Sequence, residues 1–283
     1  MKIVVASGKG GVGKSTFTAS LVSLLSQPRV VVDADVDCPD LNILFKGKEK
    51  LRRKIYASEV ASVNSEKCVK CGVCNRTCEH GAISYGNVVP DRCEGCGACV
   101  ITCPTKAISL VPYSNGELVH VKRQDFDLVY AELYPGNANS GKLVHDLREY
   151  VDMTAGDKLQ IIDAPAGIGC PVIASITSTD AMILVIEPTK SSFHDSLRMM
   201  NVADHFRVPY YVVINKSGIS AHVEHEIEKF LELKGIPLLG KIPFDRSVAE
   251  DLSNLRVPGL SELEAGKALQ KTVYGVKEMF ELR

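Results

Sequence analysis

Residues 8–15 read Gly-Lys-Gly-Gly-Val-Gly-Lys-Ser, and they constrain the fold more than any other stretch of the chain. They fit the pattern G-x-x-x-x-G-K-[ST] and lie between an apolar run at 3–6 and a helical run at 16–25. Glycines allow φ values that point successive backbone N–H groups inward, and the following helix adds its positive N-terminal end. A strand, this loop and a helix predict a phosphate-binding site. The alternative is a glycine-rich turn without a chemical role.

This pattern gives individual residues of the loop expected roles. Lys14 can reach the β- and γ-phosphates of a nucleotide, and the hydroxyl of Ser15 can bind Mg²⁺. The residues expected to contact the nucleotide here are Gly8, Gly10, Gly11, Val12, Gly13, Lys14, Ser15 and Thr16. We therefore expect ATP or ADP with Mg²⁺ as ligands.

Carboxylates follow two apolar runs that read as strands. The run 30–33 ends in Asp33 and continues to Asp35, and the run 159–163 ends in Asp163. Ligands of α/β sheets bind at the carboxyl ends of strands, so Asp33 and Asp35 can orient Mg²⁺ or a hydrolytic water. Asp163 is typical of the Walker B position beside the loop-bound Mg²⁺. Asp37 and Asp40 fit either this role or turn formation.

Further apolar runs at 181–186, 210–214 and 238–242 alternate with helical segments near 191–206 and 220–234. This alternation predicts an α/β fold with a parallel sheet covered on both faces. Asn215 follows the strand at 210–214, where its carboxamide can pair with an adenine edge or form a turn.

Residues 46–54 and 108–121 are harder to place. The basic stretch 46–54 reads as a solvated connector, although it could also contact an acidic partner. The stretch 108–121 reads as a hairpin, because Asn115-Gly116 favours a tight two-residue turn.

Eight of the ten cysteines lie between residues 68 and 103, in two runs of the form C-x₂-C-x₂-C-x₃-C. This run is the bacterial two-cluster ferredoxin pattern, in which the fourth cysteine binds the other cluster. One [4Fe–4S] cluster is therefore expected on Cys68, Cys71, Cys74 and Cys103, and the other on Cys93, Cys96, Cys99 and Cys78. Zinc is the competing interpretation, but zinc sites use two pairs rather than two triplets with a distant fourth thiol. Glu79-His80 replaces the proline expected after Cys78, which can alter solvent access at the second cluster.

Bulk properties exclude some classes of protein. The net charge of −1 gives no general attraction to nucleic acid or anionic membrane, and no apolar run approaches 18 residues. The short apolar run after Met1-Lys2 leads directly into the glycine-rich loop, so we expect no signal peptide and a cytoplasmic location. In a reducing compartment, clustered cysteines indicate metal binding rather than disulfides. The expected domains are a discontinuous P-loop ATPase domain (1–60 and 111–283) and an inserted two-cluster ferredoxin domain (61–110).

Five motifs together resemble the MinD/ParA/Mrp group of deviant Walker A ATPases, and more closely the MinD-superfamily ATPases with an inserted ferredoxin domain. They are residues 9–16, Asp33-Ala-Asp35, residues 163–167, Asn215-Lys216 and residues 242–245. The resemblance implies an ATP-bound homodimer in which Lys9 reaches the phosphates of the partner subunit. It also implies that Asp35 positions the hydrolytic water, that Asp163 supports Mg²⁺, and that Asn215 and Pro243 line the adenine site.

Cys170 and Cys38 lie outside the two cysteine runs. Cys170 follows Asp163 at the spacing of a cluster ligand in the nitrogenase iron protein, a relative in the same ATPase class. That protein needs a second cysteine in each chain, and Cys38 is an uncertain substitute. A buried, inert Cys170 is the favoured interpretation over a third, dimer-bridging cluster.

The main functional hypothesis is a slow, partner-stimulated ATPase that couples dimerisation to electron transfer or metallocluster maturation on a redox or metalloenzyme partner. The first alternative is a spatial organiser like MinD or ParA with a structural ferredoxin module. The second is an iron–sulfur cluster carrier. Neither nucleic acid nor membrane is expected as a partner. The sequence leaves open the partner's identity, the cluster potentials and the oligomeric state without nucleotide.

Overall fold

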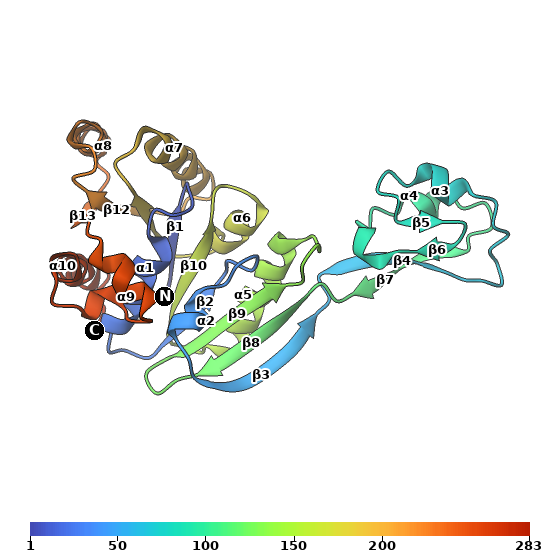
Figure 1. Cartoon of the computed structure of the whole chain (residues 1–283), viewed down its shortest axis with the longest axis horizontal. Coiled ribbons are helices and arrows are strands. Elements are labelled where there is room, and N and C mark those ends of the chain that lie inside the picture. The colour runs from blue at the N-terminus through green and yellow to red at the C-terminus, as the bar shows by residue number, and fades with distance from the viewer.

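Near-continuous apolar runs become strands of a nine-stranded sheet in the computed structural model, which describes residues 1–283 (Figure 1). From one edge to the other the strands are β13 (Leu238–Pro243), β12 (Tyr210–Ser217), β11 (Ala181–Ile186), β1 (Lys2–Ser7), β10 (Leu159–Ala166), β2 (Arg29–Asp33), β9 (Asp127–Leu133), β8 (Gly116–Lys122) and β3 (Lys48–Ile55). Neighbours from β13 to β9 are parallel, whereas β8 and β3 are antiparallel additions at one edge. The predicted α/β fold with a mostly parallel sheet is confirmed.

Helices cover both faces of the sheet, as a strand buried on both sides requires. Val4 and Ala6 of β1 pack into a core with α5 (Ser140–Thr154), α6 (Cys170–Ile176), α7 (Lys190–His205) and α8 (Ala221–Lys234). The alternate residues Ile3 and Val5 pack into a second core with α1 (Lys14–Leu24), α2 (Leu41–Leu44) and α10 (Glu264–Met279). A short helix α9 (Ser247–Ser253) and the 3₁₀ turn η2 (Pro258–Leu260) precede α10. None of these helices is long and apolar enough to cross a membrane.

Both predictions about 46–54 and 108–121 are wrong. Most of the basic stretch 46–54 forms the edge strand β3, whose register on β8 runs from Lys48 opposite Lys122 to Ile55 opposite Gly116. Exposed lysines and arginines are common on edge strands because they oppose pairing with another chain. Residues 108–121 do not form a hairpin, since β7 (Ile108–Tyr113) pairs with β4 (Ser58–Val63) while β8 pairs with β3 and β9.

Buried Asn115 explains why the hairpin does not form. Its Oδ1 accepts a hydrogen bond from the Ala57 N–H at 3.0 Å, and its Nδ2 donates to the Ala138 carbonyl at 2.9 Å. Gly116 follows with no room for a Cβ, which would lie 2.6 Å from the Glu132 carbonyl oxygen. Asn115-Gly116 therefore joins neighbouring chain segments through buried hydrogen bonds and does not form an exposed turn.

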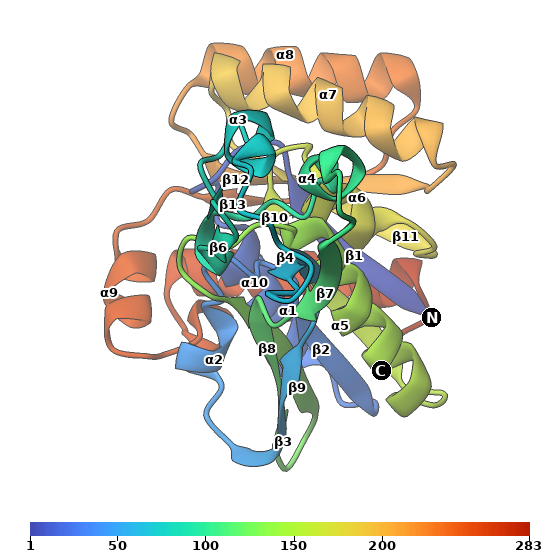
Figure 2. The same cartoon turned by 90° about the vertical axis from the view of Figure 1, so that its right-hand side faces the viewer.

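The residues between β3 and β8 form a separate lobe that projects from the edge of the sheet (Figure 1) and lies in front of it in the end-on view of Figure 2. Its two antiparallel pairs are β4 with β7, and β5 (Ile83–Ser84) with β6 (Asn87–Val88). Two short helices, α3 (Val73–Thr77) and α4 (Ala98–Thr102), and the turn η1 (Pro90–Arg92) complete it. Its paired strands begin at Ser58 and end at Tyr113, slightly outside the predicted range 61–110.

Only two residues separate each strand of the sheet edge from the lobe. Tyr56 and Ala57 join β3 to β4, and Ser114 and Asn115 join β7 to β8. Asn139, just before α5, adds a hydrogen bond from its Nδ2 to Ser58 Oγ at 2.8 Å. A short, hydrogen-bonded junction therefore joins the lobe to the rest of the molecule, the nine-stranded sheet with its helices, which we call the body.

His120, on β8, gives the body a pH-dependent stability. Its buried ring lies 2.8 Å from Tyr150 Oη through Nδ1 and 3.8 Å from Asp127 Oδ1 through Nε2. Burial, then the positive charge of Lys50, lowers the pKa of His120. The unfolded chain therefore takes up a proton near pH 6.5 while the folded chain does not, and the free energy of unfolding falls as the pH drops below about 6.5. We expect urea denaturation of His120→Gln to depend less on pH in this window.

The exposed His225 on α8 forms no ion pair and provides the matched control for this measurement. His225→Gln should keep the pH dependence of the unsubstituted chain. A His120→Gln variant with an unchanged slope between about pH 5 and 6.5 would contradict the assignment.

Candidate functional site

The glycine-rich loop lies between β1 and α1, at the carboxyl ends of the parallel strands. Gly13 has a φ of 93°, and a Cβ on it would collide with Nδ2 of Asn215. A Cβ on Gly8 would likewise collide with the backbone at Asp195. Glycine is required at both positions because neighbouring elements approach the loop backbone closely.

Asp163 is the centre of a buried polar network that joins β10 to α1. One carboxylate oxygen, Oδ2, accepts hydrogen bonds from Lys14 Nζ at 2.7 Å and from Ser15 Oγ at 2.6 Å. The other, Oδ1, accepts from Thr18 Oγ1 at 2.6 Å. Asp163 is 0% exposed and the Lys14 side chain 7%. Burial alone would lower the pKa of Lys14, but the charges of Asp163 and Asp33 outweigh it and raise that pKa. Lys14 is therefore positively charged at neutral pH.

Asp33 lies beside Asp163, because β2 and β10 are parallel with these two residues in register. Its carboxylate accepts from the backbone N–H groups of Asp35 at 3.2 Å and of Asp40 and Leu41 at 3.0 Å. Burial, then the charge of Asp163, raises the pKa of Asp33 to about 8. Asp33 thus fixes the loop that follows β2, and Asp35 occupies that loop with a half-buried side chain.

Lys9 lies on the outer side of the loop and is 44% exposed. Its Nζ donates to Ser191 Oγ at 3.1 Å and lies 4.0 Å from Glu187 Oε1. Lys216 binds the other oxygen of Glu187 at 2.8 Å and donates to the Gly11 carbonyl at 2.7 Å. Glu187 therefore joins Lys9 to Lys216, a link that the sequence interpretation missed although Glu187 directly follows a buried strand.

A pocket of about 210 Å³ opens next to the loop and is mainly apolar. Asn215 and Pro243, the two residues expected at an adenine site, both line it, with Gly11, Thr16 and Phe244. Asn215 Nδ2 donates to the Val12 carbonyl at 2.7 Å. That amide therefore fixes the loop in this structure, and its Oδ1 and second N–H are left to meet a ligand.

The eight cysteines of the lobe surround two separate cavities, four to each. One cavity is lined by Cys68, Cys71, Cys74 and Cys103, and the other by Cys78, Cys93, Cys96 and Cys99. The fourth cysteine of each sequence run therefore reaches the cavity of the other run. Four thiols around one cavity can hold a cubane cluster or a tetrahedral metal ion.

Backbone N–H groups donate hydrogen bonds to three of the sulfur atoms that line these cavities. Cys93, Cys78 and Cys103 each accept a backbone N–H at 3.3 Å, from Ala61, Ala82 and Ala107 respectively. The Ala107 bond is the main cause of the lowered pKa of Cys103. A Cβ on Gly86 would lie 3.1 Å from Cys68 Sγ, so glycine lets the chain pass close to this sulfur.

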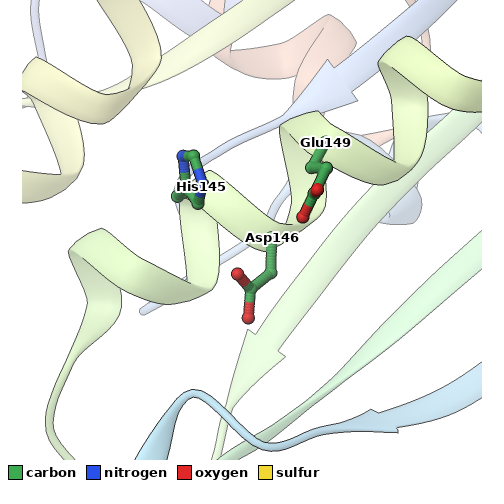
Figure 3. Close-up of side chains that lie close together, drawn as sticks. All are labelled: His145, Asp146 and Glu149. Carbon is green, nitrogen blue, oxygen red and sulfur yellow. The ribbon is translucent and has the colours of Figure 1, made fainter.

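The other candidate ligands lie outside the nucleotide pocket and the two cysteine-lined cavities. Cys38 and Cys170 are both exposed, so the expected buried Cys170 is wrong: it is the first residue of α6, on the molecular surface. His145, Asp146 and Glu149 lie together on α5, with ligand atoms within 4.8 Å of one another (Figure 3). This group lies on one helix face, where charged side chains are commonly solvated.

Residues 3–257 match the sequence profile of the CobQ/CobB/MinD/ParA nucleotide binding domain. The chain belongs to this family. It is also 35% identical over 256 residues to "Uncharacterized protein MJ0578" of Methanocaldococcus jannaschii, covering 90% of this chain and 88% of that protein. Membership of this family makes the chain a nucleotide-binding protein of the P-loop class.

Two further comparisons extend the family assignment. The iron–sulfur cluster carrier protein of Pyrococcus abyssi is 27% identical over 98% of this chain and 87% of its own length. The septum site-determining protein MinD of Pyrococcus horikoshii, solved with Mg-ADP, superposes with a TM-score of 0.63 over 99% of this chain and 96% of its own, at 16% identity. The MinD likeness shows the fold of the body.

Proposed function

We propose that this protein is an ATPase with two resident [4Fe–4S] clusters, and that nucleotide-dependent dimerisation controls electron transfer or metallocluster work on a partner protein. The two cavities carry the cluster proposal, because each is lined by the four cysteines that the crossed ferredoxin pattern pairs. When bound, such clusters supply one-electron redox chemistry. The short junction at Asn115 then supports a mechanical link between lobe and ATPase.

In the nucleotide site we assign phosphate binding to Lys14 and the loop backbone, and Mg²⁺ binding to Ser15 supported by Asp163. Lys14 and Ser15 both contact Asp163 now, so a nucleotide with Mg²⁺ would have to rearrange these contacts. Asp35 would orient the hydrolytic water from the loop that Asp33 fixes. Asn215 and Pro243 would line the base pocket.

Lys9 would bind the phosphates of the nucleotide held by the partner subunit. Its present contacts to Ser191 and Glu187 are partly exposed and weak, and Lys216 can neutralise Glu187 without it. Release of Lys9 therefore costs little, and its ammonium group is free to bind phosphates across a dimer interface.

We expect Lys9→Ala to raise the dissociation constant of the ATP-bound dimer by at least about thirtyfold, because removing one partner of a desolvated charge pair costs 2 kcal/mol or more. Light scattering with Mg-ATP in an Asp35→Ala background, where hydrolysis should be slow, measures this constant. Affinity for ADP should stay the same. Lys229→Ala, which removes an exposed lysine of α8, is the control and should dimerise normally. Normal dimerisation of Lys9→Ala would refute the cross-dimer role.

The functional proposal is tested through thermodynamic linkage between nucleotide and clusters. The midpoint potentials of the clusters, measured without oxygen, should differ between the ADP state and the ATP-bound Asp35→Ala state. If oxidised and reduced protein differ tenfold in nucleotide affinity, the shift is about 60 mV for a one-electron couple. Hydrolysis by the unsubstituted protein should also respond to cluster oxidation state. If neither quantity changes, coupling is excluded.

An iron–sulfur cluster carrier is the second candidate, and the named carrier from Pyrococcus abyssi favours it. The two functions make different predictions about cluster lability. A carrier must release its cluster to an apo-acceptor, whereas four thiols supplied by one folded lobe favour retention. Cluster transfer on mixing with an apo-ferredoxin would therefore favour the carrier.

A further inference from the structure

A polar pocket of about 700 Å³ lies at the end of the sheet opposite the nucleotide site. It is lined by residues from the end of α1 to the start of β2 (Ser23, Leu25, Ser26, Pro28 and Arg29), by the turn between β8 and β9, and by Lys50 of β3 and Lys158 before β10. Figure 1 shows this turn at the end of β8 that lies away from the lobe. Its volume is within the range of small-molecule sites, and neither the nucleotide nor the cysteine cavities account for it.

Cations outnumber carboxylates in this pocket. Arg29, Lys50, Lys122, Arg123 and Lys158 face only Asp125 and Asp127. Lys158 is already paired with Asp127 at 2.7 Å. Four cations therefore share one remaining carboxylate, Asp125, and the pocket has a positive field.

Arg29 is the strongest single indication of a ligand. It is 3% exposed, its Nη1 donates to the Gln27 carbonyl at 2.9 Å, and its buried Nε has no hydrogen-bond partner. Burial lowers the pKa of Arg29, and Asp125 is the only charge that opposes this effect. A buried guanidinium without a carboxylate contact is costly unless an anion compensates it.

A second guanidinium lies on the same aromatic ring. The Cζ atoms of Arg29 and Arg123 are 5.1 and 5.0 Å from the centroid of the Phe126 ring, and Nε of Arg123 is also buried without a partner. The ring stabilises each cation, but it does not remove the repulsion between them. An anion in the pocket that these two residues line with the exposed Lys50 and Lys122 would compensate their charges.

We propose that this pocket binds a small polyanion, a molecule that carries two or more phosphate or carboxylate groups. Planar guanidinium groups bind both anions in pairs of hydrogen bonds, and the flexible lysines add charge at the mouth. The basic character of residues 46–54 thereby acquires a role through Lys50. The proposal is independent of the cluster and ATPase assignments.

Calorimetric titration of the full-length chain, purified without oxygen and saturated with Mg-ADP, tests the proposal. The probes are fructose 1,6-bisphosphate and benzene-1,3,5-tricarboxylate, which distinguish a phosphate from a carboxylate ligand. We expect at least one probe to bind, and the double variant Lys50→Gln/Lys122→Gln to bind it at least about tenfold more weakly. Both lysines are exposed, so the variant should fold where a change at buried Arg29 would not necessarily do so.

The double variant Lys54→Gln/Lys229→Gln removes the same charge from exposed positions outside the pocket and should bind within about twofold of the unsubstituted chain. Several results would overturn the proposal: no binding of either probe, equal weakening in the two double variants, or displacement of the probe by further Mg-ADP. Binding of an oligonucleotide or of polyglutamate through Lys50 and Lys122, without either small probe, would also overturn it.

Discussion

Lys14→Ala is expected to lower the rate of ATP hydrolysis by at least about 100-fold and the free energy of unfolding by about 3–5 kcal/mol. The two losses have one origin. Lys14 is the only cation bonded to fully buried Asp163, at 2.7 Å. Its removal leaves the Asp163 carboxylate buried without a cation, beside the carboxyl group of Asp33. Hydrolysis assays and urea denaturation measure the two effects.

A double substitution separates the two effects of Lys14→Ala. Lys14→Ala/Asp163→Asn removes the uncompensated charge, so most of the stability should return while hydrolysis stays at least about 100-fold slower than in the unsubstituted chain. Lys9→Ala is the stability control, because Lys9 is partly exposed and its loss should change the free energy of unfolding by less than about 0.5 kcal/mol. Full hydrolysis by Lys14→Ala would remove this lysine from the catalytic site.

Substitution of single cysteines should remove one cluster at a time, and in crossed pairs. Cys103→Ala should have the spectrum of Cys68→Ala, although Cys103 belongs to the second sequence run, because both residues line the same cavity. Cys78→Ala should match Cys96→Ala for the same reason. Iron content should fall from about eight to about four atoms per chain in each variant. Iron and sulfide analysis with electron paramagnetic resonance measures both quantities.

Cys170→Ala is the matched control, because Cys170 is a free cysteine on α6, outside the lobe. It should retain about eight iron atoms. If Cys103→Ala instead matched Cys96→Ala, the crossed ligand sets would be wrong. If the unsubstituted chain bound zinc and no iron, the cluster proposal would fail.

Much of the site could be predicted because its signals are local. The residues of a phosphate loop are contiguous, and those of the cysteine runs have fixed spacing. Thr18 and Glu187 were missed for different reasons. Thr18 bonds to Asp163 across a distance of 145 residues, which only the packing of α1 on β10 creates. Glu187 directly follows the buried strand β11, and the rule that singled out Asp33 at the end of β2 would have found it.

The sheet edge was the part of the fold that local rules could not predict. Asn115-Gly116 has the composition of a tight turn, but buried hydrogen bonds to Ala57 and Ala138 outweigh that preference. Residues 46–54 have few apolar side chains, so their strand depends on backbone pairing with β8 rather than on an alternating pattern. Both errors arise where a long insertion separates two strands that pair.

The pairing of β3 with β8 also bears on how the lobe can be gained or lost in evolution. Ile55 and Gly116 face each other as the last paired residues of β3 and β8. Joining them through a two-residue turn would close an ordinary hairpin and leave the order of all nine strands unchanged. The lobe is thus an insertion whose two ends lie next to each other at the edge of the sheet. A lineage could gain or lose it in one genetic step, and a laboratory could exchange it for another domain whose ends lie equally close.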